Sequence, residues 1–374
     1  MSKIKILHIL WHGRSGGAER FVQDIVLFTD RSRFDHQVCF MSFGGWMADA
    51  IAESGIPVYY LGMNTGRSLL SALRFFRLMR SVNPDIVMVH SRNFLISLFL
   101  LFSPLSIKVF FEHGVTFEGM RALYTKIYYN LLIIRFAVVL ANSENSRELL
   151  LKNTHLTAEK VKLFYIGIDL EKYGRIPLER RSKLRRDLSI MDGCLVVGGV
   201  GRLFVYKGFD DFIRIAKAIV NVRNNMQFLI VGDGPERQRL ERLAAELNVS
   251  VKFLGDRQDV HELLNVMDVF LFSGRFESFG IVLLEALAVG VPIVSFKIPG
   301  PMEVIKKCGG GILISPGSLD AISAAVVDLL DNPEKRQKLV EEGYANVRKY
   351  FNVRNRIAEL ESIYEFLIKK KGHA

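Results

Sequence analysis

Short apolar runs that fit β-strands alternate with helical patterns along almost the whole chain of 374 residues. In the first half, strands are predicted at residues 4–10, 37–43, 57–61, 86–90, 108–112, 137–141 and 161–165. Helices are predicted at 17–28, 69–82 and 143–151, the last with Ser143 as its N-cap. Alternation of this kind predicts a parallel sheet with helices on both faces.

A second alternating series begins after a charged connection at residues 171–186, which contains a proline. Its strands are predicted at residues 195–199, 227–231, 251–253, 269–272, 292–296 and 311–314. Because a chain of this length is too long for one ordinary core, we expect an α/β protein with two Rossmann-like, doubly wound domains. The predicted domains are residues 1–170 and 171–352, followed by an amphipathic helix in the segment 353–374.

Glycine-containing loops follow several of the predicted strands. Ligands of doubly wound sheets bind at the carboxyl ends of strands, and glycine lets a ligand approach the backbone closely. The first strand is followed by Gly16 and Gly17, and the strand at 227–231 by Gly232. The strand at 195–199 is followed by Gly201 and Arg202, with Lys207 just before the next helix.

The segment 276–287 contains two carboxylates, Glu277 and Glu285, with seven residues between them. The apolar run that begins at Phe279 predicts a buried helix, and the free amides of its first turn suit a phosphate. A helical rise over eight residues covers about 12 Å, so the carboxylates could accept hydrogen bonds from hydroxyls at both ends of a sugar nucleotide. Taken alone, the segment fits equally well a buried helix with two incidental acids.

The charge of the chain limits the classes of partner, and its cysteines indicate the compartment. The 50 basic and 39 acidic residues give a formal charge of +11, which favours nucleotide diphosphates, acidic membrane surfaces or nucleic acid. No zinc-ligand spacing, RNA-binding consensus or long basic arm is present, so we do not expect a nucleic-acid partner. Three scattered cysteines indicate a reducing cytoplasm.

The apolar segments do not predict a secretory signal or a membrane span. The segment after Lys3 and Lys5 fits a strand that leads into a loop. The uncharged run at 94–107 is shorter than a membrane span and contains Pro104. We therefore expect a cytoplasmic protein that is soluble or peripheral at the inner face of the cytoplasmic membrane.

These motifs, in this order, resemble the retaining glycosyltransferases of the GT-B type, in the family marked by two glutamates with seven residues between them. The resemblance extends from Gly16, Gly17 and Glu19 to the segment after Pro299. It implies two Rossmann-like domains that face a cleft, with the final helix crossing back to the first domain. The first domain would bind the acceptor and the second the nucleotide sugar.

The resemblance also implies roles for the residues of the second domain. Arg202 and Lys207 would neutralise the diphosphate leaving group, Glu285 would bind the ribose, and Glu277 would bind the hexose and act in catalysis. The predicted donor site consists of Gly16, Gly17, Gly201, Arg202, Lys207, Gly232, Arg257, Glu277, Ser278, Phe279, Gly280 and Glu285. For Arg257, a solvated charged loop fits equally well. Relatives usually carry an acid before the lysine, where this chain has Tyr206.

On the acceptor side, His113 follows the strand at 108–112, and in this family a histidine at this place faces the reacting centre. A neutral imidazole there would accept or orient a proton. Arg14 and Glu19 are further candidates for acceptor binding, although a solvated loop and helix start fit them equally well. The sequence contains no Asp-x-Asp motif, so we expect neither a metal nor another cofactor beside the nucleotide-sugar co-substrate.

The predicted helix at 69–82 combines apolar and basic residues. We expect its core-facing stripe to contain Leu69, Leu70, Leu73, Phe76 and Val82. The positive charges around it are Arg67, Arg74, Arg77 and Arg80. Such a helix either packs on its sheet or lies on an anionic bilayer, and the second case would suit a lipid-linked acceptor.

The function implied by the resemblance is transfer of a hexosyl group from a nucleotide-diphosphate sugar to an acceptor hydroxyl with retention of configuration. The donor is expected to be a UDP-sugar, from the family's commonest usage, and the acceptor a lipid-linked or cell-envelope glycan. The alternatives are a non-catalytic sugar-nucleotide-binding partner of an assembly, or a GT-B sugar-nucleotide epimerase.

Overall fold

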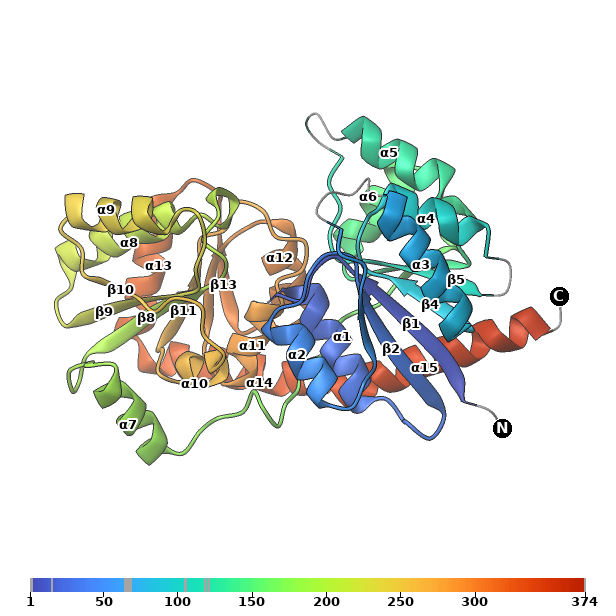
Figure 1. Cartoon of the computed structure of the whole chain (residues 1–374). Coiled ribbons are helices and arrows are strands. Elements are labelled where there is room, and N and C mark those ends of the chain that lie inside the picture. Colours follow the sequence, from blue (N-terminus) through green and yellow to red (C-terminus); the bar gives the residue numbers. More distant parts are fainter. Residues whose placement is uncertain are drawn as a thin grey trace. The chain divides into compact units, whose positions relative to one another are not determined.

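The computed structural model describes residues 3–14, 16–63, 69–103, 106–117, 119 and 122–372. The chain forms two compact units, residues 1–167 with 353–374 and residues 168–352 (Figure 1). Arg67, one of the positive charges considered above, lies outside the described residues.

The first unit is built on a seven-stranded parallel sheet in the order β3-β2-β1-β4-β5-β6-β7. Its strands are β1 (Ile4–Leu10), β2 (Phe34–Phe40), β3 (Val58–Tyr60), β4 (Ile86–Val89), β5 (Ile107–Glu112), β6 (Val138–Ala141) and β7 (Val161–Leu163). Its helices are α1 (Gly17–Phe28), α2 (Trp46–Glu53), α3 (Leu69–Val82), α4 (Phe94–Leu101), α5 (Ala122–Leu131), the 3-10 turn η2 (Ile133–Arg135), α6 (Glu144–Asn153) and α15 (Val353–Gly372). The Ser143 side chain accepts a hydrogen bond from the Ser146 amide at 3.1 Å, which confirms the predicted N-cap.

The second unit has a six-stranded parallel sheet in the order β10-β9-β8-β11-β12-β13. Its strands are β8 (Leu195–Val200), β9 (Met226–Val231), β10 (Val251–Phe253), β11 (Val269–Phe272), β12 (Ile293–Phe296) and β13 (Gly311–Ile314). Its helices are α7 (Leu178–Asp187), η3 (Val205–Lys207), α8 (Phe209–Val222), α9 (Arg237–Glu246), α10 (Val260–Asn265), α11 (Ile281–Ala288), α12 (Pro299–Cys308), α13 (Leu319–Asp331) and α14 (Pro333–Tyr350). Two doubly wound parallel sheets confirm the predicted α/β fold class.

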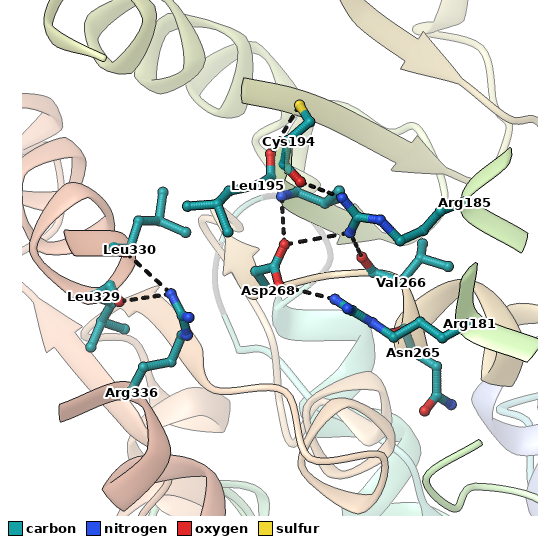
Figure 2. Close-up of polar contacts among 11 residues, drawn as sticks. Arg181, Arg185, Cys194, Leu195, Asn265, Val266, Asp268, Leu329, Leu330 and Arg336 are labelled. Carbon is teal, nitrogen blue, oxygen red and sulfur yellow. Dashed lines mark hydrogen bonds and ion pairs between the residues drawn. The ribbon is translucent and has the colours of Figure 1, made fainter. Parts of the chain in front are cut away.

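The segment predicted as a charged connection at 171–186 is partly helical, because α7 occupies its second half. Figure 2 shows how α7 is held: Arg181 and Arg185 both reach Asp268, at 3.0 and 3.7 Å. The same carboxylate accepts the backbone amide of Val196 at 2.8 Å. These charge-assisted bonds tie α7 to the amino ends of β8 and β11.

In a second contact, the Arg336 side chain, at the start of α14, donates to the carbonyls of Leu329 and Leu330 at the end of α13.

The last helix, α15, belongs to the first unit. Its Glu361 carboxylate accepts the Asp30 amide at 2.8 Å and pairs with Arg33 at 3.3 Å. Its Tyr364 is buried and donates to the sulfur of Met88 on β4 at 3.1 Å. The return of the final helix to the first unit, which the GT-B resemblance implies, is therefore present in the structure.

The bounds of α3 agree with the prediction, but the predicted core face is wrong. Leu70, Leu73 and Phe76 are 58%, 49% and 40% exposed. The residues that face the core are Ser71, Ala72, Phe75, Met79 and Val82. The stripe that packs on the sheet is rotated by one to two positions from the predicted one, and of the predicted members whose side chains are described only Val82 is buried.

Candidate functional site

Three loops at the carboxyl edge of the second sheet are joined by backbone hydrogen bonds. The Gly201 amide, after β8, donates to Val231 at 2.9 Å, and Leu203 donates to Asp233 in the loop after β9 at 2.9 Å. Gly232 in turn donates to Gly255, after β10, at 2.8 Å. Gly232 has a φ of 133°, and a Cβ atom there would lie 2.0 Å from the Gly201 carbonyl. Glycine is therefore required where these loops meet.

Lys207 and Glu277 form an ion pair in this region, with 2.5 Å between Nζ and Oε2. Their side chains are only 17% and 16% exposed. Lys207 ends the short turn η3, and Gly208 in the left-handed conformation then opens α8. The Lys207 side chain also lines a small cavity with Val200, Phe209, Leu271, Phe272 and Ser273. A lysine and a carboxylate that lie 70 positions apart in the sequence are thus brought into direct contact.

The helix that follows Glu277 begins later than predicted. α11 starts at Ile281 instead of Phe279, because Gly280 has a left-handed φ of 89°. The Glu277 carbonyl accepts the Gly300 amide at 2.9 Å, which fixes this loop to the start of α12. The predicted separation of the Glu277 and Glu285 carboxylates assumed a helix over the whole interval. The chain is helical only from Ile281 to Glu285, so the estimate applies only to that part. Ser278 and Glu285 are both 6% exposed.

Arg202 is oriented by the residue that departs from the family pattern. Its guanidinium donates to the Tyr206 hydroxyl at 3.2 Å and lies 5.3 Å from the centre of the Phe204 ring. Arg275, which was not predicted as a site residue, braces this turn. Its backbone amide donates to the Tyr206 carbonyl at 2.9 Å, and its side chain pairs with Asp210 at 2.8 Å. Tyr206 thus offers Arg202 a hydroxyl acceptor in place of the carboxylate expected from the resemblance.

Arg257 lies next to the joined loops, two positions after Gly255. Its guanidinium is bound by Asp259 of the same loop at 2.7 Å, and the side chain is 40% exposed. Phe279 and Gly280 lie in the loop before α11, and Glu285 is the fifth residue of that helix.

In the first unit, Gly16 and Gly17 lie at the start of α1, as predicted. A Cβ atom on Gly16 would lie 2.3 Å from a carboxylate oxygen of Glu19, so glycine makes room for that side chain. Glu19 is 6% exposed and lies 3.6 Å from His12. Glu19 is therefore turned toward the loop and is not a solvated helix start, whereas Arg14 is exposed.

His113 is the end of a row of four histidines. His36, His8, His90 and His113 are linked in that order by contacts of 2.9, 3.2 and 3.1 Å between ring nitrogens. Burial lowers the pKa of His36 and of His113 to about 3, and the pKa values of His8 and His90 are lowered well below the usual range for the same reason. Only His113 was predicted as a site residue, although His8 and His90 also lie within or at the end of predicted apolar strands.

Two family models match the chain, one in each unit. The model for Glycosyl transferases group 1 matches residues 180–346, and the model for Glycosyltransferase Family 4 matches residues 15–172. The chain belongs to the group 1 glycosyltransferases. This family and the GT-B fold are those that its motifs predicted.

Two similar proteins are transferases whose names contain a lipid. A GDP-mannose-dependent phosphatidylinositol monomannoside mannosyltransferase of Corynebacterium glutamicum is 32% identical over 48% of this chain and 50% of that protein. The match thus spans about half of that relative's length. A UDP-Gal:alpha-D-GlcNAc-diphosphoundecaprenol alpha-1,3-galactosyltransferase of Escherichia coli is 24% identical over 99% of both chains.

A solved structure with the same fold is that of HepE from Anabaena, in complex with UDP and glucose. It aligns with a TM-score of 0.85 and 23% identity, covering 97% of this chain and 99% of that one. In the part of the chain that the structure describes, no helix combines the length and the apolar character needed to cross a bilayer.

Proposed function

We propose that this glycosyltransferase moves a hexosyl group from a nucleotide-diphosphate sugar to an acceptor hydroxyl, with retention of configuration. The observation that carries the proposal is the Lys207–Glu277 ion pair, set among the joined loops and just before α11. A cation beside uncapped helix amides suits a diphosphate, and the neighbouring carboxylate suits a sugar hydroxyl. In this proposal the second unit, residues 171–352 in our prediction, binds the donor.

The leaving diphosphate gains negative charge as the glycosidic bond breaks. Lys207 and Arg202 would stabilise that charge, because both are preorganised by contacts with Glu277 and Tyr206. When the diphosphate binds, Lys207 would exchange part of its contact with Glu277 for a phosphate oxygen. Glu277 would then be available to the hexose, and the amides of Ser278, Phe279 and Gly280 to the sugar or phosphate.

The other end of the donor would be held by Glu285, through the ribose hydroxyls, and by Arg257, near the base. Gly16, Gly17, Gly201 and Gly232 would let the backbone approach the donor closely. We propose a UDP-sugar as the donor, which agrees with the printed name of the relative from Escherichia coli. Another relative is named as GDP-mannose-dependent, so GDP-sugars must be tested beside UDP-sugars.

Thermal-shift measurements test this donor class. UDP-glucose and UDP-galactose should raise the melting temperature of the full chain more than GDP-mannose does, since ligands that bind only the native state stabilise it. Glu285→Gln should abolish most of the shift, and the exposed Glu334→Gln should keep it. A shift with GDP-mannose alone would contradict the UDP preference, and no shift with any sugar nucleotide would contradict the donor site.

We further propose that transfer needs no metal. The charge that a metal would neutralise is assigned to Arg202 and Lys207, and the sequence has no Asp-x-Asp motif. EDTA should therefore leave the rate of transfer unchanged, measured as release of the nucleoside diphosphate. A rate that EDTA removes and Mn²⁺ or Mg²⁺ restores would contradict this assignment.

For the acceptor we propose a lipid-linked or cell-envelope glycan, bound by the first unit through His113, Arg14 and Glu19. The names of the relatives from Corynebacterium glutamicum and Escherichia coli both contain a lipid-linked acceptor. The alternatives, a non-catalytic nucleotide-binding partner or an epimerase, gain no specific support. The relatives are named as transferases, and the cationic and acidic side chains at the donor site are intact.

A lipid-linked acceptor would be met at a membrane surface, and α3 offers a suitable face. Leu70, Leu73 and Phe76 are exposed next to Arg77 and Arg80, and the Arg80 guanidinium lies 4.4 Å from the centre of the Phe76 ring. We propose that this face binds the anionic inner surface of the cytoplasmic membrane, as a peripheral contact of a cytoplasmic enzyme.

Vesicle flotation tests the membrane contact. The chain should bind vesicles that contain phosphatidylglycerol and should not bind vesicles of phosphatidylcholine alone. Arg77→Glu with Arg80→Glu should weaken binding by tenfold or more, because each basic residue near such a surface contributes about 1 kcal/mol. The matched control is Lys335→Glu with Lys338→Glu, on α14. Equal loss in both double variants would contradict a contact specific to α3.

A further inference from the structure

Four histidines cross the sheet of the first unit as a continuous row. His36 lies on β2, His8 on β1, His90 directly after β4 and His113 directly after β5. These are four neighbouring strands in the sheet order, so the row crosses the sheet toward the carboxyl end of β5. Each ring is joined to the next by a contact of 3.2 Å or less between nitrogens.

Aromatic side chains of α1 and α15 enclose the row. Phe21 of α1 lies edge-on to His90 and to His113, with 6.0 Å between ring centres in both cases. Tyr364 of α15 lies 6.4 Å from His36. His8, His36 and His90 are 0%, 2% and 5% exposed. Bulk water therefore does not compete for their hydrogen bonds.

The pattern of nitrogens makes the row cooperative. Each contact joins Nδ1 of one ring to Nε2 of the next: His36 to His8, His8 to His90, and His90 to His113. A neutral imidazole has one N–H donor and one acceptor nitrogen. If all three contacts are hydrogen bonds between neutral rings, either every Nδ1 carries the proton or every Nε2 does. A change of tautomer in one ring then requires the same change in all four.

Burial keeps the rings neutral, which this cooperativity requires. Burial, together with the positive charge of Arg31, lowers the pKa of His36 to about 3. The inner end of the row also favours one arrangement. Nε2 of His36 is buried and has no hydrogen-bond partner among the described residues. A buried N–H without a partner is rarer than a buried acceptor without one, and the charge of Arg31 favours a lone pair. The arrangement with every Nδ1 protonated is therefore preferred.

We propose that His8, His36 and His90 are positioning residues that act as one hydrogen-bonded unit and place the proton of His113 on its Nδ1. His113 would then accept a hydrogen bond from His90 through Nε2 and would carry its own N–H donor on Nδ1. It would orient an oxygen of the acceptor or donor by donating a hydrogen bond. This differs from the role of proton acceptor that the sequence suggested. The catalytic meaning of the inference depends on the proposed function, whereas the tautomer itself does not.

Nitrogen NMR of the full chain labelled with ¹⁵N-histidine tests the tautomer directly, because protonated and unprotonated ring nitrogens have different chemical shifts and couplings. In the unsubstituted protein we expect His113, His90, His8 and His36 all to carry the proton on Nδ1. A proton on Nε2 of His113 would overturn the inference without any variant.

Two variants test the coupling along the row. His36→Phe keeps an aromatic ring but removes the inner donor, and it should change the tautomer population of His113, which it does not touch. His36→Gln serves as the second variant if the first does not fold. The control is His155→Gln, an exposed position in the same unit, which should leave the His113 signals unchanged. An unchanged His113 tautomer in the folded His36 variant would overturn the inference.

Kinetics then distinguish positioning from packing. His36→Phe should lower kcat of transfer by about tenfold, part of the 10²- to 10⁴-fold that a positioned acid or base typically contributes, with little change in KM for the donor. A coupled tautomer with unchanged kcat would overturn the positioning role. If the chain transfers no sugar at all, the proposed function fails, and the NMR result still decides whether the row sets the His113 tautomer.

Discussion

At the scale of residues, Lys207 and Glu277 hold each other in place through an ion pair. The two side chains neutralise each other at 2.5 Å and are both mostly buried, so each holds the other in one position. In the proposed reaction, this preorganisation lets Lys207 meet the leaving diphosphate without rearrangement of the loop.

Lys207→Ala should lower turnover by roughly 10²-fold, since removal of one preorganised donor typically costs about 3 kcal/mol of transition-state stabilisation. Steady-state transfer assays would measure this, with kcat reduced more than the affinity for the donor. The exposed Lys338→Ala is the control and should behave as the unsubstituted enzyme. Turnover within twofold of normal in Lys207→Ala would remove this residue from the leaving-group site.

The sequence predicted that Gly201, Gly232 and Lys207 lie in loops or at helix starts, but not their mutual contacts. Gly201, Gly232 and Lys207 could be selected because each follows a predicted strand or opens a helix. The histidine row could not be predicted in this way. His8 meets His90 across 82 positions and His36 across 28, and these contacts depend on the strand order β2-β1-β4-β5. Tyr206 was recognised only as a departure, and its hydrogen bond to Arg202 required the coordinates.

At the scale of elements, the strand and helix pattern predicted the architecture well, and the differences have local causes. β2 begins at Phe34, three positions before the predicted start, because its pairing with β1 begins there, at Ile4. α11 begins two positions late because Gly280 is left-handed. In α3, leucine and phenylalanine occupy both faces, so hydrophobicity alone could not choose between the stripe that contains Phe75 and the one that contains Phe76.

The buried histidines make the first sheet sensitive to acid. The folded pKa of His36 is about 3, below its unfolded value of about 6.5, so the unfolded chain binds more protons between these values. The contribution of neutral His36 to the free energy of unfolding should therefore be fully present above about pH 6.5. It should decrease as the pH is lowered toward 3. For His36 alone, the loss at pH 5 should be about 2 kcal/mol.

Hydrogen exchange of the β1 amides at pH 5 and pH 7, corrected for the intrinsic exchange rate, measures this loss. The His36→Phe variant should lose about 2 kcal/mol less than the unsubstituted protein over the same interval. An identical pH dependence in both proteins would show that folding does not lower the pKa of His36.

At the scale of the whole molecule, the chain combines two doubly wound units with an excess of positive charge. The charge of +11 is consistent with anionic ligands, and in our proposal these are the ligands of glycosyl transfer. In our proposal the second unit holds the donor through its loops at the carboxyl edge of the sheet, and the first unit holds the acceptor near His113. The fold alone would not specify these roles, which depend on the particular side chains at each edge.

The central claim is that the loops around Lys207 and the start of α11 bind the diphosphate of a sugar nucleotide. A crystal structure of the full chain with UDP or a UDP-sugar tests this most directly. We predict that the diphosphate lies within hydrogen-bonding distance of Lys207 and Arg202, with the ribose hydroxyls at Glu285. A diphosphate bound away from these three side chains would contradict the account.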